Sequence, residues 1–355
     1  MKDAHRYVPV LKWKAGEQTA LRNLTPDVKQ AIFPLLEVVD VSVRTGGGAT
    51  KSLREHLNHA ASQMEKCWGT SAPLLLDTHL LSPGRDVEGA SALAYVVEQA
   101  HALNVAAVPV VSTDCTPDDL RAVAGAAAGL GVAVRAPIGN VVKPSFPSVL
   151  MRTLKTLGVS PGQVDFVLDV REVGEDNREA MAVAVEAALT RLPATSEWRS
   201  LTVAAAAFPV NLTGMKPGLH MLPRADWTMW TSLSGLPRQP DFGDYAIAHP
   251  DLPNLDMRKV KVSASIRYTA PDSFVVARGR VVTDDRHGGY AQFITLSGDL
   301  VNHRAFAGPS FSWGDDYIVT CADGGPSGNL TTWRQVGTNH HITMVVKQLA
   351  KWSGS

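Results

Sequence analysis

The chain has 355 residues, with 34 Lys or Arg against 34 Asp or Glu, so its formal net charge is zero when histidine is neutral. Proteins that bind nucleic acid through its phosphates usually carry a basic excess, so this balance argues against bulk nucleic-acid binding. The hydrophobic share of 45% is that of an ordinary globular protein, and the length fits one large barrel or two modest domains.

Short apolar segments alternate with helical patterns through the first two thirds of the chain. Strands are predicted, in chain order, over 7–12, 33–38, 73–77, 106–111, 132–135, 165–169, 201–207 and 244–248. Helices are predicted over 16–24, 53–67, 91–103, 146–157, 179–192 and 224–233, and Thr116 begins a capping pattern for an alanine-rich helix that ends near residue 129.

The predicted strands are apolar on both faces, and most are followed by a helix. This arrangement is typical of an α/β protein with a (β/α)8 TIM-like barrel, which we place at residues 1–250. A doubly wound open sheet with an extra C-terminal domain remains the alternative.

The pattern becomes richer in strands after residue 250. Strands are predicted over 263–268 and 273–278, and a helix over 292–301. Asn339 resembles the N-cap of a last helix that runs to Lys351. Because no Pro-rich or Ser-rich linker precedes this region, we expect residues 251–355 to form an α+β extension that packs on the barrel and completes its site.

Cysteines and terminal sequence indicate the compartment. Cys67, Cys115 and Cys321 are far apart and form no CxxC pair, so neither a disulfide framework nor a zinc ribbon is expected. The first residues lack the apolar segment of a signal peptide, and no apolar stretch is long enough for a membrane span. We therefore expect a cytoplasmic protein without a membrane partner.

Charged side chains follow nearly every predicted strand. In a parallel barrel the carboxyl ends of the strands and their loops form the active face, so these side chains are expected in one polar pocket. The residues at the strand ends are Lys12, Lys14, Glu37, Asp40, Asp77, His79, Ser112, Asp114, Arg135, Asp169, Arg171, Asp244 and Tyr245. We assign acid/base roles to the carboxylates Glu37, Asp77 and Asp169.

Basic groups favour an anionic ligand at this face, because arginine forks match phosphate and carboxylate geometry. The ligand-binding candidates are Lys12, Lys14, Arg135, Tyr245, Arg267, Arg278, Trp313 and His340. The alternative is structural: charged strand ends meet water in any barrel, and the arginines could pair with the carboxylates in a closed internal network.

The C-terminal candidates each have a second interpretation. Arg267 and Arg278 lie on one face if their strands form a hairpin, where an exposed ion-pairing role is equally consistent. Trp313 could stack on a ring or fill a junction in the fold. The segment 337–341 could open the last helix, so that His340 adds charge to an anion site; exposed histidines beside a capping Asn339 are the alternative.

Established catalytic motifs are missing. The sequence has no P-loop, no GxGxxG after the first strand, no GxSxG elbow and no HExxH. The pair Asp77 and His79 could ligate a metal, but few further histidines lie at strand ends. No cofactor is predicted, and binding of a divalent metal ion is kept as an alternative.

Five segments together resemble one family. They are YVPVLKWKAGEQTALRNL with IFPLLEV, then FGDYAIAHPD, ASIRYTAPDSFVVARGR, FSWGDDYI and TTWRQVGTNHHITMVVKQLA. Together they are similar to the Beta protein family, named for a protein of a satellite bacteriophage, over nearly the whole chain. The matching positions are Lys12, Lys14, Glu37, Asp244, Tyr245, His249, Arg267, Arg278, Trp313, Asp315, Asp316, His340 and His341. The glycines at 46–48 and the alanine-rich middle depart from the pattern.

The resemblance implies a role in conflict between phage and host, in a small operon whose partner is toxic or defensive, but it supplies no reaction. The sequence thus predicts a barrel protein of phage defence or immunity that binds a nucleotide or other phosphate-bearing anion at the barrel mouth. The alternatives are a non-catalytic antitoxin that binds a protein partner from the same operon, and a metal-dependent phosphodiester hydrolase. Any catalysis is expected to be hydrolysis of a phosphate-bearing substrate.

Overall fold

A closed barrel of eight parallel strands forms the first part of the molecule in this computed structural model, which describes residues 6–40, 52–82, 86–251 and 261–353. The strand order around the barrel is β1-β11-β9-β8-β7-β6-β3-β2. The bounds are β1 Tyr7–Lys12, β2 Leu35–Glu37, β3 Leu74–Asp77, β6 Ala107–Val111, β7 Val132–Pro137, β8 Val164–Glu172, β9 Ser200–Ala206 and β11 Asp241–Asp244. The closed ring confirms the predicted barrel and excludes the open sheet.

The eighth strand was predicted wrongly. We expected it over 244–248, but β11 ends at Asp244, where the predicted strand would begin. The Asp244 carboxylate accepts the backbone N–H of Ala246 at 2.9 Å, and Ala246 has a positive φ of 52°, so the chain turns there. The apolar residues that follow are buried in the barrel mouth and under the C-terminal part, which explains their strand-like composition.

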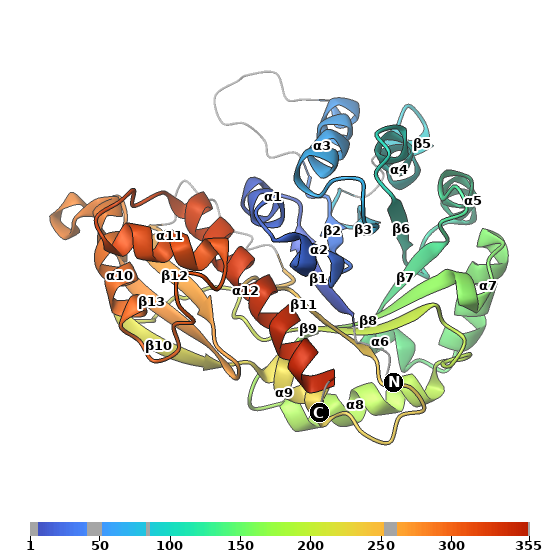
Figure 1. Cartoon of the computed structure of the whole chain (residues 1–355). Helices are drawn as coiled ribbons and strands as arrows, with labels where there is room; N and C mark the ends of the chain where they lie inside the picture. The colour runs from blue at the N-terminus through green and yellow to red at the C-terminus, as the bar shows by residue number, and fades with distance from the viewer. Residues whose placement is uncertain (1–5, 41–51, 83–85, 252–260, 354–355) are drawn as a thin grey trace.

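Helices cover the outside of the barrel (Figure 1). They are α1 Ala15–Arg22, α2 Pro26–Gln30, α3 Leu53–Cys67, α4 Ala92–Ala102, α5 Pro117–Ala126, α6 Ile138–Val141, α7 Phe146–Leu157, α8 Arg178–Arg191 and α9 Ala225–Ser232. Thr116 caps α5 as predicted, because its hydroxyl accepts the backbone N–H of Asp119. The short strands β4 Asp86–Val87 and β5 Ala90–Ser91 pair before α4, while the glycines at 46–48 lie outside the described residues.

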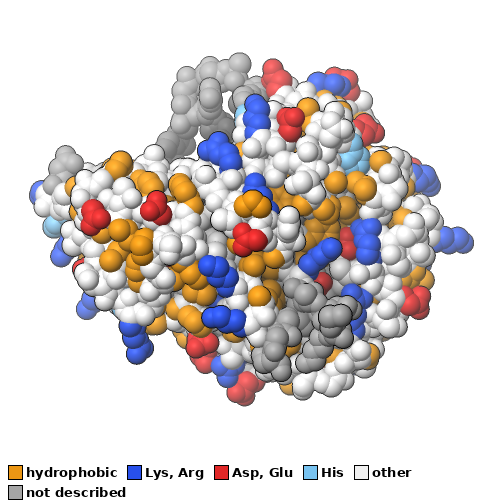
Figure 2. Space-filling view, viewed as in Figure 1, with side chains coloured by type: hydrophobic (Ala, Val, Ile, Leu, Met, Phe, Trp, Pro, Cys, Tyr) orange, Lys and Arg blue, Asp and Glu red, His pale blue; other side chains and the backbone are white. Residues whose placement is uncertain are grey.

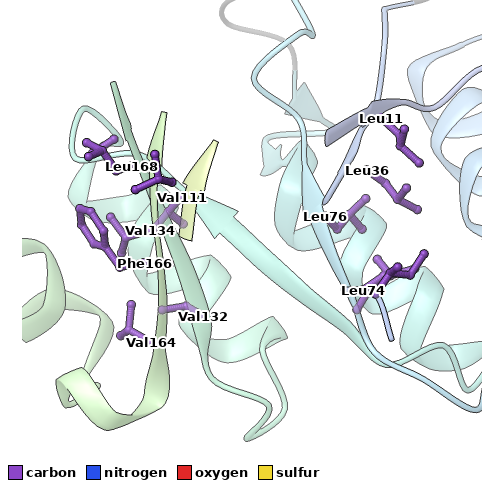
Figure 3. Packing of buried hydrophobic residues seen from close by; sticks show 14 of the residues in the cluster. Leu11, Leu36, Leu74, Leu76, Val111, Val132, Val134, Val164, Phe166 and Leu168 are labelled. Carbon is purple, nitrogen blue, oxygen red and sulfur yellow. The ribbon is translucent and has the colours of Figure 1, made fainter. Parts of the chain in front are cut away.

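Alternation along each strand builds two apolar layers. One set of residues, including Val8, Val10, Leu35, Leu75 and Val167, packs in the barrel interior. The intervening residues face the helices; Figure 3 shows this set on several strands, with Leu11, Leu36, Leu76, Val134, Phe166 and Leu168 among those labelled. Because side chains alternate, a charged residue at an inward position of a strand end faces the barrel axis.

The C-terminal part is a three-stranded antiparallel sheet with helices on it. Its strand order is β10 Gly218–Pro223, β13 Ser273–Val281 and β12 Ser263–Thr269, and its helices are α10 Gln292–Val301, α11 Trp313–Ala322 and α12 Leu330–Ser353. β12 and β13 form the expected hairpin. Since β10 precedes β11 in the chain, the polypeptide leaves the barrel, adds a strand to this sheet and returns to close the barrel.

The long helix α12 joins the two parts, running beside both in Figure 1. Asn339 does not cap it, contrary to our prediction: α12 begins at Leu330, and Asn339 lies in its middle, 1% exposed. Gly337 suggested a boundary, but its role is close packing. A Cβ there would lie 2.6 Å from the carbonyl oxygen of Arg267 and 2.7 Å from a methyl group of Ile247.

The surface carries mixed charge. Figure 2 shows basic and acidic side chains interspersed over one face of the molecule, in line with the balanced composition. Among the helices in the described ranges, none combines the length and apolarity needed to cross a bilayer.

Candidate functional site

Inward-facing charges meet at the carboxyl-terminal mouth of the barrel. Lys12, Glu37 and Asp77 are register partners at the ends of β1, β2 and β3. Arg135 of β7 and Asp169 of β8 reach the same place from the opposite wall, and all five side chains are buried. We expected strand-end charges to share one pocket, and these five residues, which are far apart in the sequence, do meet at the mouth. Together with Tyr245 we call them the mouth cluster.

Arg135 is the centre of the mouth cluster. Its Nη1 donates to Glu37 Oε1 at 2.8 Å and to Asp77 Oδ2 at 2.9 Å. Its Nε and Nη2 donate to Asp169 Oδ2 at 3.0 and 2.8 Å, and Nη2 also lies 2.6 Å from the hydroxyl oxygen of Tyr245. The Tyr245 hydroxyl in turn donates to Asp169 at 2.7 Å. The guanidinium group thus holds three carboxylates, as the closed-network alternative described.

Neighbouring basic groups lower the pKa of the buried Asp77 carboxyl group. Burial alone would raise the pKa of Asp77, but His79 and Arg135 outweigh it and lower that pKa from 3.8 to about 2. His79 contributes through its Nδ1, 3.0 Å from Asp77 Oδ2, and through its backbone N–H, 2.9 Å from Asp77 Oδ1. Asp77 is therefore ionised throughout the neutral range.

We expect this pKa to be visible in acid unfolding. Since the folded-state pKa lies below the unfolded value of 3.8, ionised Asp77 stabilises the fold above about pH 4, and the contribution is lost as the pH falls toward 2. The difference corresponds to about 2 kcal/mol. Urea unfolding between pH 6 and 2.5 should show the wild type losing about that much more than Asp77→Asn. Asp118→Asn, at an exposed site on α5, is the control. If Asp77→Asn loses as much free energy of unfolding between pH 6 and 2.5 as Asp118→Asn does, this assignment is contradicted.

An open cleft lies over the mouth cluster. Its volume is about 560 Å³, within the range of small-molecule sites. Asp77, Arg135 and Asp169 form its floor, and the side chains around them include those of His79, Ser82, Ser112, Cys115 and Arg171. The strands β3, β6, β7 and β8 and the loops after them supply most of this lining, and α4 and α5 supply the rest.

His79 connects the cleft to the buried charges. Its side chain is 38% exposed, while Nδ1 contacts Asp77 and Nε2 lies 3.5 Å from Glu37 Oε1. The other oxygen of Glu37, Oε2, is buried without a hydrogen-bond partner among the described residues, and the ammonium group of Lys12 is 3.9 Å away. A titratable group that is both accessible and held by carboxylates is suited to proton transfer.

Backbone geometry aims Arg171 at the cleft. The register of β8 against β9 shifts between Asp169 and Arg171, and Arg171 has a φ of 66°. Its N–H donates to Asp169 Oδ1 at 3.0 Å, and its guanidinium pairs with Asp251 on the surface. Bulges of this kind redirect side chains beside functional sites, and a left-handed non-glycine residue is maintained only by its surroundings.

Lys12 and Lys14 occupy different environments. Lys12 Nζ donates to the carbonyl oxygens of His249 and Pro250 at 2.7 and 3.0 Å, so it anchors the chain after β11. Burial lowers the pKa of Lys12, and Glu37 opposes this effect. Lys14 is exposed at the start of α1 and does not line the cleft.

The C-terminal candidates lie outside the mouth cleft. Arg267 and Arg278 line a second pocket between the C-terminal sheet and α12. Trp313 begins α11 and packs beside Tyr317, with ring centroids 6.0 Å apart. The structure contradicts the predicted helix-end position of His340, because His340 is 0% exposed within α12 and bonds Asp315 and the carbonyl oxygen of Thr269, each at 2.8 Å.

His79 and Arg171 appeared among the strand ends, His79 also as a possible metal ligand beside Asp77, but neither was among our catalytic or ligand-binding candidates. A local signal was present: Asp77, Asp169 and Asp244 each accept the N–H of the residue two positions on. Such a bond turns the chain at the strand end and fixes the direction of the residue that follows. Within the described ranges, no group of three or more His, Cys, Asp or Glu side chains is arranged to hold a metal ion.

Comparisons with known proteins give one family. The sequence profile described as Beta protein matches residues 7–347, which include both the barrel and the C-terminal part. The comparison with curated proteins found no match. Among solved structures, the chain is similar to a chitinase from Chromobacterium violaceum, with 12% sequence identity and a TM-score of 0.33, over 95% of this chain and 99% of the chitinase chain.

Proposed function

The chain belongs to the Beta protein family, and we propose that it binds a small phosphate-bearing ligand, such as a nucleotide, in the cleft at its barrel mouth. The observation that carries this proposal is the convergence of charged residues from five strands on one point beneath an open cleft. Sites in this fold collect their groups from several strand ends in the same way.

The ligand contacts follow from which basic side chains of the cleft are accessible. Hydrogen bonds to protein acceptors occupy Nε and both terminal nitrogens of Arg135, so its role is to position the carboxylates. Arg171 and His79 are the accessible basic groups of the cleft lining that the structure describes, at 41% and 38% side-chain exposure. We assign the phosphate contact to these two side chains.

Proton transfer is the chemistry that this arrangement supports. An imidazole that donates from Nδ1 to Asp77 and from Nε2 to the bound phosphate holds a transferable proton at Nε2, with Glu37 beside it. In hydrolysis, the oxygen of an attacking water bonds to phosphorus while the phosphorus–oxygen bond to the leaving group breaks, and Nε2 gives its proton to the leaving oxygen. The water releases its proton to solvent, and Nε2 takes up a proton from solvent before the next cycle.

Calorimetric titration with AMP tests the proposal. We expect His79→Ala and Arg171→Ala each to weaken AMP binding by about tenfold or more, since a hydrogen bond to a charged group is worth about 1.5–3 kcal/mol. If AMP or p-nitrophenyl phosphate is hydrolysed, His79→Ala should lower the rate by about a hundredfold or more, as is usual for the loss of a general acid.

Arg121→Ala is the matched control, because Arg121 is an exposed arginine on α5 that does not line the cleft. Binding that is unchanged in His79→Ala and Arg171→Ala, or reduced equally in Arg121→Ala, would contradict the proposed site. The cellular setting that we propose is phage defence or immunity in the cytoplasm, in which the same variants should lose protection.

A protein partner is the second candidate, as for an antitoxin. Among the described residues β10 pairs only with β13, so its other edge is open, and Leu219 and Met221 on it are 40% and 48% exposed. Exposed apolar residues on an edge strand are typical of sites where another chain adds a strand. If cells that carry His79→Ala or Arg171→Ala are still protected against phage, this candidate is favoured.

A further inference from the structure

A second pocket lies beside the C-terminal sheet, between that sheet and α12. Its volume is about 300 Å³, and it lies among the segment after β9, the strands β12 and β13 and the first turns of α12. Its charged lining among the described residues consists of Lys261, Arg267, Arg278 and Arg334, with no carboxylate. We call it the arginine pocket; it shares no lining residue with the mouth cleft.

Three guanidinium groups from three elements converge there. Arg267 Nη1 and Arg334 Nη1 donate to the same oxygen, the carbonyl of Ile247, at 2.6 and 3.1 Å. Arg278 pairs with Ser265 across the hairpin, and Ser265 lies two residues before Arg267 on the same strand. Arg267 and Arg278 are therefore on the same face of the hairpin. Like charges are thus held side by side, which costs free energy unless a negative group joins them.

Arg278 retains unused donors. Its Nε is buried without a hydrogen-bond partner in the described structure, and its Nη2 reaches the carbonyl oxygen of Leu212 only at 3.5 Å, the weak limit of a hydrogen bond. A buried donor without a partner is uncommon in a folded protein. It indicates that an acceptor enters this pocket.

The surrounding protein fixes these cations and supplies one carboxylate, Glu17, beside Arg334. Arg267 lies over the ring of Phe208, 4.4 Å from its centroid, which sets the direction of the guanidinium. Burial, then the charges of Arg334 and Arg278, lower the pKa of Arg267 well below its ordinary range. The Glu17 carboxylate lies 3.8 Å from Arg334 Nε, and burial raises the pKa of Glu17.

We propose that the arginine pocket is a second binding site, for the phosphate group of a small phosphorylated molecule. Planar guanidinium forks from several directions match the oxygens of a phosphate, and a doubly charged anion suits several cations better than a single carboxylate does. The volume is small, so the ligand is a compact metabolite rather than a polymer. The hydroxyl groups of Thr213, Ser263 and Ser265 line the same space and can bond the remainder of the ligand.

Titration calorimetry with inorganic phosphate, at constant ionic strength, tests this site. The double variant His79→Ala/Arg171→Ala is used as the background, so that the mouth cleft does not contribute. Phosphate should still bind to this variant, and adding Arg278→Gln or Arg334→Gln should weaken binding by tenfold or more. Arg280→Gln is the matched control, because Arg280 is an exposed arginine of β13 that does not line the pocket.

Three outcomes would overturn the proposal: no phosphate binding in the background variant, binding indifferent to Arg278→Gln and Arg334→Gln, or binding reduced equally by Arg280→Gln. Succinate in a parallel titration distinguishes the ligand class, since tighter binding of the dicarboxylate than of phosphate would also overturn it. Arg278→Lys keeps the charge and serves as a second variant if Arg278→Gln folds poorly. A negative phosphate titration at the arginine pocket does not change the result expected for AMP at the mouth cleft. A negative AMP titration likewise does not change the result expected at the arginine pocket.

Discussion

Replacing Arg135 by methionine is expected to lower the free energy of unfolding by about 3–5 kcal/mol, because three buried carboxylates then lose their common cation. Glu37, Asp77 and Asp169 are each within 3.0 Å of the guanidinium and at most 4% exposed. Methionine fills much of the arginine volume, so the loss reports the charge and not a cavity. Urea unfolding at pH 7 measures it.

A variant without Arg135 and its three carboxylates is the sharper comparison. Combining Arg135→Met with Glu37→Gln, Asp77→Asn and Asp169→Asn removes the guanidinium group together with its partners and keeps Lys12, and we expect it to recover part of the loss. Arg121→Met, at an arginine with 64% side-chain exposure, should change stability by less than about 0.5 kcal/mol. A loss below about 1 kcal/mol in Arg135→Met would show that the carboxylates are not held by this residue.

The second large effect is expected at Asp244, which links β11 to α12. Its Oδ1 accepts from the Tyr7 hydroxyl at 2.6 Å, and its Oδ2 lies 2.8 Å from His341 Nε2, with all three side chains 0% exposed. Asp244→Ala leaves the tyrosine hydroxyl and the histidine buried without this acceptor. We expect it to lower the free energy of unfolding by about 3 kcal/mol.

Burial lowers the pKa of His341, although Asp244 opposes this effect. The bond between them therefore joins a neutral ring to an ionised carboxylate at pH 7. Asp118→Ala, at a carboxylate with 94% side-chain exposure, is the control and should leave the free energy of unfolding almost unchanged. If Asp244→Ala matches that control in urea unfolding, the contact between α12 and the barrel does not depend on this carboxylate.

The sequence was most informative about the barrel. Seven of its strands overlap the observed ones substantially, because each is an apolar run that ends in a charge or a turn. The eighth strand and α12 were misplaced for one physical reason: tertiary packing overrode the local signal. Residues 245–247 are apolar because they are buried in the mouth and under the C-terminal part, and Gly337 is a close contact between a helix and a strand rather than a helix end.

The mouth cluster could be predicted because the geometry of a parallel barrel brings strand ends together. No such rule places Arg267 and Arg278, since β12 and β13 belong to another sheet, and their position relative to the barrel is set by α12 and the chain after β9. Asp315, His340 and His341, which carry part of the family resemblance, have structural positions. All three are 0% exposed; His340 bonds Asp315 of α11 within the C-terminal part, and His341 bonds Asp244 of β11, so His341 maintains the contact between the two parts of the molecule.

A crystal structure of the protein with AMP tests the central claim most directly. The account predicts electron density in the cleft above Asp77 and Asp169, with phosphate oxygens within hydrogen-bond distance of His79 and Arg171. An empty cleft, with the nucleotide absent or bound only elsewhere, would contradict a ligand site at the barrel mouth.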